Sequence, residues 1–174
     1  MPDANAHYAK RLMMTRWLGL DPGLARIGWA VLEGESGQAP QLLDYGVIET
    51  EKNLTTPARL LEIEQDLSYL LAEFKPDDIA IEMPFFNRQI KAAGGVLQAL
   101  GVINLVIYRD LGKVPIFLHQ ASWKCHLGHG RASKQEVAAM LQQFFVLDTA
   151  AIDDSVDAIG IALAGFQGLR NDIT

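Results

Sequence analysis

The stretch WLGLDPGLARIGWAVL, residues 17–32, decides the fold of this chain. Two short apolar segments, 16–20 and 27–32, are separated by Asp21-Pro22-Gly23, a sequence typical of turns. A third apolar segment follows at 42–48. Because short segments joined by short turns tend to pair as neighbours, we predict three antiparallel strands here.

Downstream of these strands, helical and strand patterns alternate. Apolar residues recur at helical spacing up to Phe74, after Thr55 or Thr56 as cap and Pro57 in the first turn. The further predicted elements are strands at 78–82 and 114–118 and helices at about 88–111, 133–145 and 153–166. Three antiparallel strands followed by this alternation predict an α/β fold, a mixed five-stranded sheet with helices on both faces.

Length and composition indicate one globular domain. The chain has 174 residues, of which 49% are apolar and 21% charged, and this excludes disordered and collagen-like classes. One cysteine excludes a disulfide scaffold, and the apolar stretches are too short for a membrane span. The polar N-terminus lacks the apolar region of a secretion signal, so we expect a cytoplasmic protein. We expect a flexible tail at 1–16, the domain at 17–168 and a C-terminal tail at 169–174.

The net charge of −6 argues at first against a nucleic-acid partner. However, the segment 83–134 carries seven basic residues and one acidic residue, a formal charge of +6. If this segment folds onto one face, that face could still meet a polyanion. The simpler interpretation is a solvated run of charges without a partner, and charge alone favours it.

Four carboxylates occupy positions where ligands gather in such folds. Asp21 and Glu82 each end a predicted strand, and the carboxyl ends of strands are the usual ligand edge of an open α/β sheet. Asp154 and Asp157 are three residues apart in the last predicted helix and therefore share one of its faces. The helix face that carries Asp154 and Asp157 could face the carboxyl ends of the strands.

Each acid also has a purely structural interpretation. An aspartate before Pro-Gly is a common turn residue, and Asp154 near a helix start is favoured by capping and by the helix dipole. Glu82 ends a buried strand and Asp157 lies near an apolar stripe, so both are harder to explain structurally.

Converging carboxylates would repel one another unless cations neutralised them. Two divalent ions match four carboxylates in charge, and oxygen ligands suit Mg²⁺, with Mn²⁺ as a substitute, better than zinc. Two such ions can activate a water and stabilise the leaving oxygen of a phosphodiester. We therefore expect two Mg²⁺ ions per subunit, held by the four acids.

With these motifs in place, the sequence resembles the RuvC family of Holliday junction resolvases, which have an RNase H-like fold. The matching motifs are Gly19-Leu20-Asp21-Pro22-Gly23, Ile27-Gly28-Trp29-Ala30, Ile79-Ala80-Ile81-Glu82 with Phe85, Gln98-Ala99-Leu100-Gly101, Lys124, the run from Gly128 to Val137, and the run from Asp154 to Ala162. Their order and spacing hold from Trp17 to Ala164. Together they are specific, although each alone is weak.

The resemblance implies that Asp21, Glu82, Asp154 and Asp157 are the catalytic, metal-binding acids. It also implies a homodimer that cuts opposing strands of four-way junction DNA symmetrically in recombination and repair, with a branch-migration motor as a further partner. The residues expected at the DNA are Lys124 and Lys134 near the scissile phosphate, Phe85 stacking at the crossover, and Arg88, Lys91 and Arg131. The family is usually basic, so the acidity of this chain predicts weaker or more salt-sensitive binding.

Three other interpretations remain open on the sequence. The domain could bind branched DNA or protein without catalysis, although all four acids are present. It could be a nuclease of the same fold that acts on RNA or flaps. It could also be an ATP-using enzyme of the related actin and sugar-kinase fold, but the chain is short for the second lobe that closes over a nucleotide.

Overall fold

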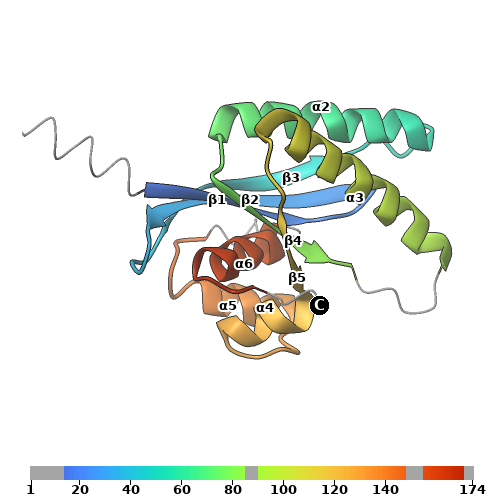
Figure 1. Cartoon of the computed structure of the whole chain (residues 1–174). Helices are drawn as coiled ribbons and strands as arrows, with labels where there is room; N and C mark the ends of the chain where they lie inside the picture. Colours follow the sequence, from blue (N-terminus) through green and yellow to red (C-terminus); the bar gives the residue numbers. More distant parts are fainter. Residues whose placement is uncertain (1–13, 85–89, 148–154, 171–174) are drawn as a thin grey trace, which may run out of the picture.

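The structure is a computed structural model that describes residues 14–84, 90–147 and 155–170 (Figure 1). The predicted tail up to residue 13 lies outside the described residues. So do the predicted site residues Phe85, Arg88 and Asp154.

A five-stranded mixed sheet forms the centre of the fold, in the order β3-β2-β1-β4-β5. The strands are β1 (Met14–Asp21), β2 (Arg26–Glu35), β3 (Gln41–Glu49), β4 (Asp78–Met83) and β5 (Ile116–His119). The first three pair antiparallel, whereas β4 pairs parallel with both β1 and β5. This arrangement confirms the predicted fold class.

Helices cover both faces of the sheet (Figure 1). The helices α2 (Thr56–Phe74) and α3 (Ile90–Leu111) lie above it in the view of Figure 1. The helices α4 (Gln120–Leu127), α5 (Lys134–Leu141) and α6 (Ser155–Phe166) lie below it.

Alternation along the strands divides the core into two layers. In β1, Leu18 and Leu20 face α2 and α3, whereas Trp17 belongs to the cluster around α6. The α2–α3 layer adds Ile63 and Ile103 to that side. Because one residue of slip in β1 would exchange its two faces, burial on both sides fixes its register.

Helix α2 follows its sequence signals with one difference. Its residues Ile63, Leu67, Leu70 and Leu71 are buried at helical spacing, and it ends at Lys75, which adopts a left-handed conformation before Pro76. Thr55 is the N-cap residue, as one predicted alternative had it. Its side chain makes no capping hydrogen bond, however, so the predicted side-chain cap is wrong.

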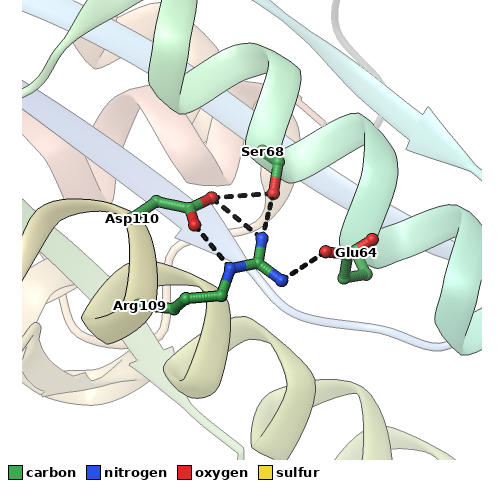
Figure 2. A network of polar contacts seen from close by, with 4 residues as sticks. All are labelled: Glu64, Ser68, Arg109 and Asp110. Carbon is green, nitrogen blue, oxygen red and sulfur yellow. Dashed lines mark hydrogen bonds and ion pairs between the residues drawn. The ribbon is translucent and has the colours of Figure 1, made fainter.

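A polar network joins α2 to α3 on their exposed side (Figure 2). Arg109 donates hydrogen bonds to Glu64 and Ser68 of α2 and to its neighbour Asp110, which also accepts from Ser68 at 2.7 Å. These contacts lower the pKa of Asp110 and raise that of Arg109. Arg109 therefore directs its charge to neighbouring side chains of α2 and α3.

The structure differs from the predicted elements in several places, most clearly in β1, α4 and α5. β1 begins at Met14 rather than near residue 16, because residues 14–16 pair with β2, so the folded part starts before the predicted domain boundary. The short helix α4 was not predicted. Helix α5 begins at the predicted capping box of Ser133 and Glu136 but ends at Leu141. Within the described residues, no helix is both long and apolar enough to cross a membrane.

Candidate active site

Two neighbouring parallel strands bring Asp21 and Glu82 to one edge of the sheet. In the register of β1 and β4, Leu20 lies opposite Ile81. Asp21 is the residue after Leu20, and Glu82 is the residue after Ile81. Both carboxylates are half-buried and leave adjoining strands at the same level, as the sequence predicted.

Helix α6 brings Asp157 to the same edge. A Cβ on Gly19 of β1 would lie 2.2 Å from the backbone oxygen of Ala158, and one on Gly165 would lie 2.5 Å from the ring of Trp17. The helix therefore runs antiparallel to β1 in close backbone contact, and its first turn lies at the carboxyl end of the strand. Asp157 belongs to that first turn.

Asp157 is buried, with 5% of its surface exposed. Its Oδ1 atom has no hydrogen-bond partner among the described residues. A buried carboxylate oxygen without a partner is costly in a folded protein unless another group satisfies it. A bound cation is one group that would satisfy it.

Glu82 is held by two donors from α4, the helix that follows β5. Trp123 Nε1 donates to Glu82 Oε2 at 2.8 Å, and Gln120 Nε2 approaches Oε1 at 3.3 Å. Trp123 is fully buried, and its ring packs against Gly160 of α6. The orientation of Glu82 is therefore fixed by the packing of α4 between β4 and α6.

The surroundings of Glu82 raise its pKa. Burial is the largest cause, and the negative charge of Asp157 adds to it. The hydrogen bonds from Trp123 and Gln120 and the positive charge of Lys124 act in the opposite direction. Glu82, Asp157 and Lys124 are thus close enough to influence one another, and the protein alone does not fully compensate the carboxylate charge.

We expect Glu82→Gln to raise the melting temperature of the metal-free protein at about pH 8, and this gain to shrink toward about pH 4. The raised pKa means that Glu82 stabilises the fold most at acid pH, and that this contribution is lost as the pH rises through the folded-state value. Each kcal/mol of stability that the substitution restores raises Tm by roughly 2–4 °C in a domain of this size. Calorimetry in EDTA over a pH series measures the difference.

The exposed Glu73→Gln is the matched control, and it should change Tm little at any pH. Two results would contradict the assignment of an uncompensated charge to Glu82. One is a Glu82→Gln protein with a lower Tm than wild type at neutral pH, and the other is a difference in Tm that is the same at all pH values.

Lys124 of α4 is buried, with 7% of its surface exposed. Its Nζ atom lies 3.3 Å from the backbone oxygen of Ala132 and 5.2 Å from the centroid of the Trp123 ring. Lys124 is therefore not a solvated surface lysine. The positive charge acts on Glu82 from inside the protein.

The remaining basic residues of segment 83–134 divide into two groups. Arg131 and Lys134 are exposed around the start of α5, on the same face of the sheet as Lys124. Lys113, in contrast, donates to the backbone oxygen of Asp77, as Arg109 bonds within its own network. The condition that the whole segment folds onto one face is therefore not met, because α3, which carries Arg109, lies on the opposite side of the sheet from α4 and α5. Lys91 belongs to α3, but its side chain is not described.

The described acids form part of the predicted set. Asp21, Glu82 and Asp157 come to one edge of the sheet, whereas Asp154 lies outside the described residues. Among residues 14–84, 90–147 and 155–170, no three His, Cys, Asp or Glu side chains form a group close enough to hold a metal ion. The oxygen donors and the unsatisfied Asp157 Oδ1 fit a hard divalent cation, provided that these side chains draw together around it.

Trp123 and Gln120 are the site residues that the sequence did not reveal. Trp123 is fully buried, and its contact with Glu82 was not predicted. One signal was available, since a buried tryptophan usually finds an acceptor for its indole N–H. The identity of the acceptor depends on the placement of α4, a helix without a strong sequence pattern.

Comparison with known sequences agrees with this geometry. A family model described as "Crossover junction endodeoxyribonuclease RuvC" matches residues 17–165. The protein of that name from Synechocystis sp. is 69% identical over 158 residues, which cover 91% of this chain and 95% of the relative. That from Petrotoga mobilis is 37% identical and covers 83% of this chain and 89% of its own.

Solved structures show the same likeness. RuvC of T. thermophilus in complex with a Holliday junction substrate superposes with a TM-score of 0.78 at 30% identity, covering 86% of this chain and 91% of that chain. The yeast mitochondrial Holliday junction resolvase Ydc2 superposes with a TM-score of 0.65 at 16% identity, covering 88% and 78%, and supports the fold alone.

Proposed function

The chain belongs to the RuvC family of crossover junction endodeoxyribonucleases, and from this premise we propose that it resolves Holliday junctions. It makes paired symmetric nicks in four-way DNA junctions during homologous recombination and DNA repair. The observation that carries the proposal is the presence of Asp21, Glu82 and Asp157 at one edge of the sheet, in a chain that matches the family over nearly its whole length.

Under this proposal, Asp21, Glu82, Asp154 and Asp157 hold two Mg²⁺ ions per subunit, with Mn²⁺ as a substitute. When bound, such a pair supplies an activated water and positive charge for the leaving oxygen of the phosphodiester. The support from this chain is the unsatisfied Asp157 Oδ1 and the raised pKa of Glu82. Both features indicate carboxylate charge that the surrounding protein does not neutralise and that a bound cation would neutralise.

The other residues position the acids and the DNA. Trp123 and Gln120 hold the Glu82 carboxylate in one orientation. Lys124 places a desolvated positive charge beside it, where it can also stabilise charge developing on a scissile phosphate. Arg131 and Lys134, exposed nearby, are proposed to contact the DNA backbone, as are Arg88 and Lys91, with Phe85 stacking on a base at the crossover.

The test of this function is incubation of the purified protein with an end-labelled mobile four-way junction and Mg²⁺. Paired nicks at symmetric positions, leaving ends that a ligase can seal, are the expected result. RNA–DNA hybrids and flap substrates of equal length serve as comparisons. Preferential cleavage of these substrates would instead favour a different nuclease of the same fold, and junction binding without any cleavage would favour a non-catalytic module.

We expect Mg²⁺ to raise the melting temperature, because cations relieve carboxylate repulsion only in the folded state. At a concentration about 100 times Kd, binding adds about 2.7 kcal/mol, or roughly 5–10 °C in Tm. Thermal unfolding at increasing Mg²⁺ concentration measures the shift, and Asp157→Asn is the matched variant that should lose most of it. Equal shifts in the two proteins would show that the ions bind elsewhere.

The proposal includes a homodimer, which matches the twofold symmetry of the substrate. On α3, Leu97, Leu105 and Tyr108 are half or more exposed, and Gly101 lies between them with open space beside it. These positions are separated by one or two helical turns and share one face. An exposed apolar helix face of this kind fits a second copy of the same helix.

Leu105→Glu is therefore expected to convert a dimer into a monomer, because it places a charge in the middle of this face. Sedimentation velocity or light scattering measures the change. Val146→Glu, at an exposed apolar residue far from α3 in the sequence, is the control and should leave the dimer intact. A monomeric wild type, or a dimer that Leu105→Glu leaves unchanged, would contradict this interface.

The proposal places the activity in the cytoplasm, with junction DNA as substrate, a branch-migration motor as a further partner and no membrane partner. The support for these statements is the family of the chain and the nature of the substrate.

A further inference from the structure

A threonine and an arginine hold the turn that follows Asp21. Thr50, the residue after β3, has 7% of its surface exposed. Its backbone N–H donates to the oxygen of Ala25 at 3.1 Å, and its hydroxyl donates to the oxygen of Leu24 at 2.8 Å. Both acceptors belong to the short connection between β1 and β2. Thr50, which is far from Asp21 in the sequence, thus fixes the backbone of the turn that follows Asp21.

Arg59 completes this arrangement from the first turns of α2. Its Nε atom donates to the hydroxyl oxygen of Thr50 at 2.8 Å, which orients the hydroxyl proton toward Leu24. Its Nη2 atom is buried and has no hydrogen-bond partner among the described residues. The Arg59 side chain as a whole is partly buried, and its Nε contact with Thr50 is the one that links α2 to the turn.

The same turn is restrained from two further sides. A Cβ on Gly23 would lie 2.4 Å from the backbone oxygen of Arg26, so the chain is tightly folded there. The side chain of Leu24 packs beneath α3, where a Cβ on Gly95 would lie 2.9 Å from its Cδ2 atom. Together with the contacts of Thr50, which follows β3, and Arg59 of α2, the contact with α3 restrains the four residues that follow Asp21.

We propose that Thr50 and Arg59 are positioning residues for Asp21, which hold the 22–25 turn so that Asp21 stays level with Glu82 for cation binding. They touch neither the cation nor the DNA. This inference rests on the proposed function, because it assigns Asp21 to the metal site. Substitution of a residue that positions a metal ligand commonly lowers metal affinity or activity by about 10–100-fold.

Thr50→Val tests the proposal because it removes the hydroxyl with little change of shape. The Mg²⁺ concentration for half-maximal junction cleavage is expected to rise about tenfold, with much of the rate recovered at saturating Mg²⁺. The Mg²⁺ concentration for half of the Tm shift should rise by the same factor, and junction affinity in EDTA should not change. Thr50→Ser, which keeps the hydroxyl, should restore the wild-type requirement.

Thr15→Val is the matched control. The Thr15 hydroxyl also bonds a backbone oxygen, that of Gly34 at 3.3 Å, but it lies between β1 and β2 at the far end of β1 from Asp21. It should change Tm without changing the Mg²⁺ requirement. If Thr50→Val behaves in the same way as Thr15→Val, the role of Thr50 is structural only and the proposal is overturned.

Two further outcomes keep the test decisive. If Thr50→Val shows no cooperative unfolding, Arg59→Met carries the test, with the same tenfold shift expected and an unchanged Mg²⁺ requirement overturning the proposal. If wild type cleaves no junction, the proposed function fails. The Mg²⁺-dependent Tm shift still decides whether Thr50 positions Asp21 for the cation.

Discussion

Replacing Asp157 with Asn is expected to lower the rate of junction cleavage by at least about 10³-fold, equivalent to about 4 kcal/mol of transition-state stabilisation. The amide keeps the shape of the side chain but removes the charge that would bind a cation. Asp157 is the most buried of the described acids, and its Oδ1 atom has no hydrogen-bond partner among the described residues, so we expect the largest effect here. Single-turnover cleavage of a labelled junction measures it.

Two accompanying measurements separate chemistry from folding and binding. Junction affinity in EDTA should not fall, because the carboxylate that is removed repels the DNA backbone and does not bind it. The metal-free Tm should be equal or higher, because a buried charge is removed. Asp66→Asn, at an exposed acid on α2, is the control and should cleave normally. Wild-type cleavage by Asp157→Asn would exclude this residue from the chemistry.

Gly19→Ala is expected to destabilise the fold by at least about 3 kcal/mol, or to prevent folding, because it forces β1 and α6 apart. The new Cβ would lie 2.2 Å from the oxygen of Ala158 and 2.6 Å from the nitrogen of Ala162. Both are backbone atoms that no side-chain rotation can move. A loss of this size lowers Tm by roughly 6–12 °C.

The same substitution should also weaken the response to Mg²⁺, because Asp157 precedes Ala158 and would move with the helix. Chemical denaturation and the Mg²⁺-dependent Tm shift measure the two effects. Gly94→Ala in α3, where nothing lies within 4 Å of the new Cβ, is the control and should be neutral or stabilising. If Gly19→Ala has the stability and the Mg²⁺ response of wild type, the close contact of β1 with α6 is contradicted.

The strands and long helices could be predicted from sequence because each carries its own local pattern. The alternation in β1 and β2 and the buried stripe of α2 are visible without tertiary structure. Helix α4 has no such stripe, since Trp123 and Lys124 are its buried residues, and it forms where β5 leads into the packing against α6. Its sequence alone gives too little periodicity for a prediction.

The acids at the strand ends could be predicted for a related reason. Topology places the ends of parallel neighbouring strands together, so Asp21 and Glu82 follow from the order of the elements. The contacts that tune them depend on side chains from distant elements, as with Trp123 at Glu82 and Arg59 at Thr50. The contacts of a basic side chain also depend on distant elements, and Arg109 of α3 bonds to Glu64 of α2.

The most direct test of the proposed site is the position of Mn²⁺ in crystals of this protein, located by anomalous diffraction. The account predicts two neighbouring peaks at the carboxyl edge of β1 and β4, in contact with Asp21, Glu82, Asp154 and Asp157, and no such peaks in Asp157→Asn crystals. Peaks at other positions, or an empty edge at a Mn²⁺ concentration that supports cleavage in solution, would contradict it.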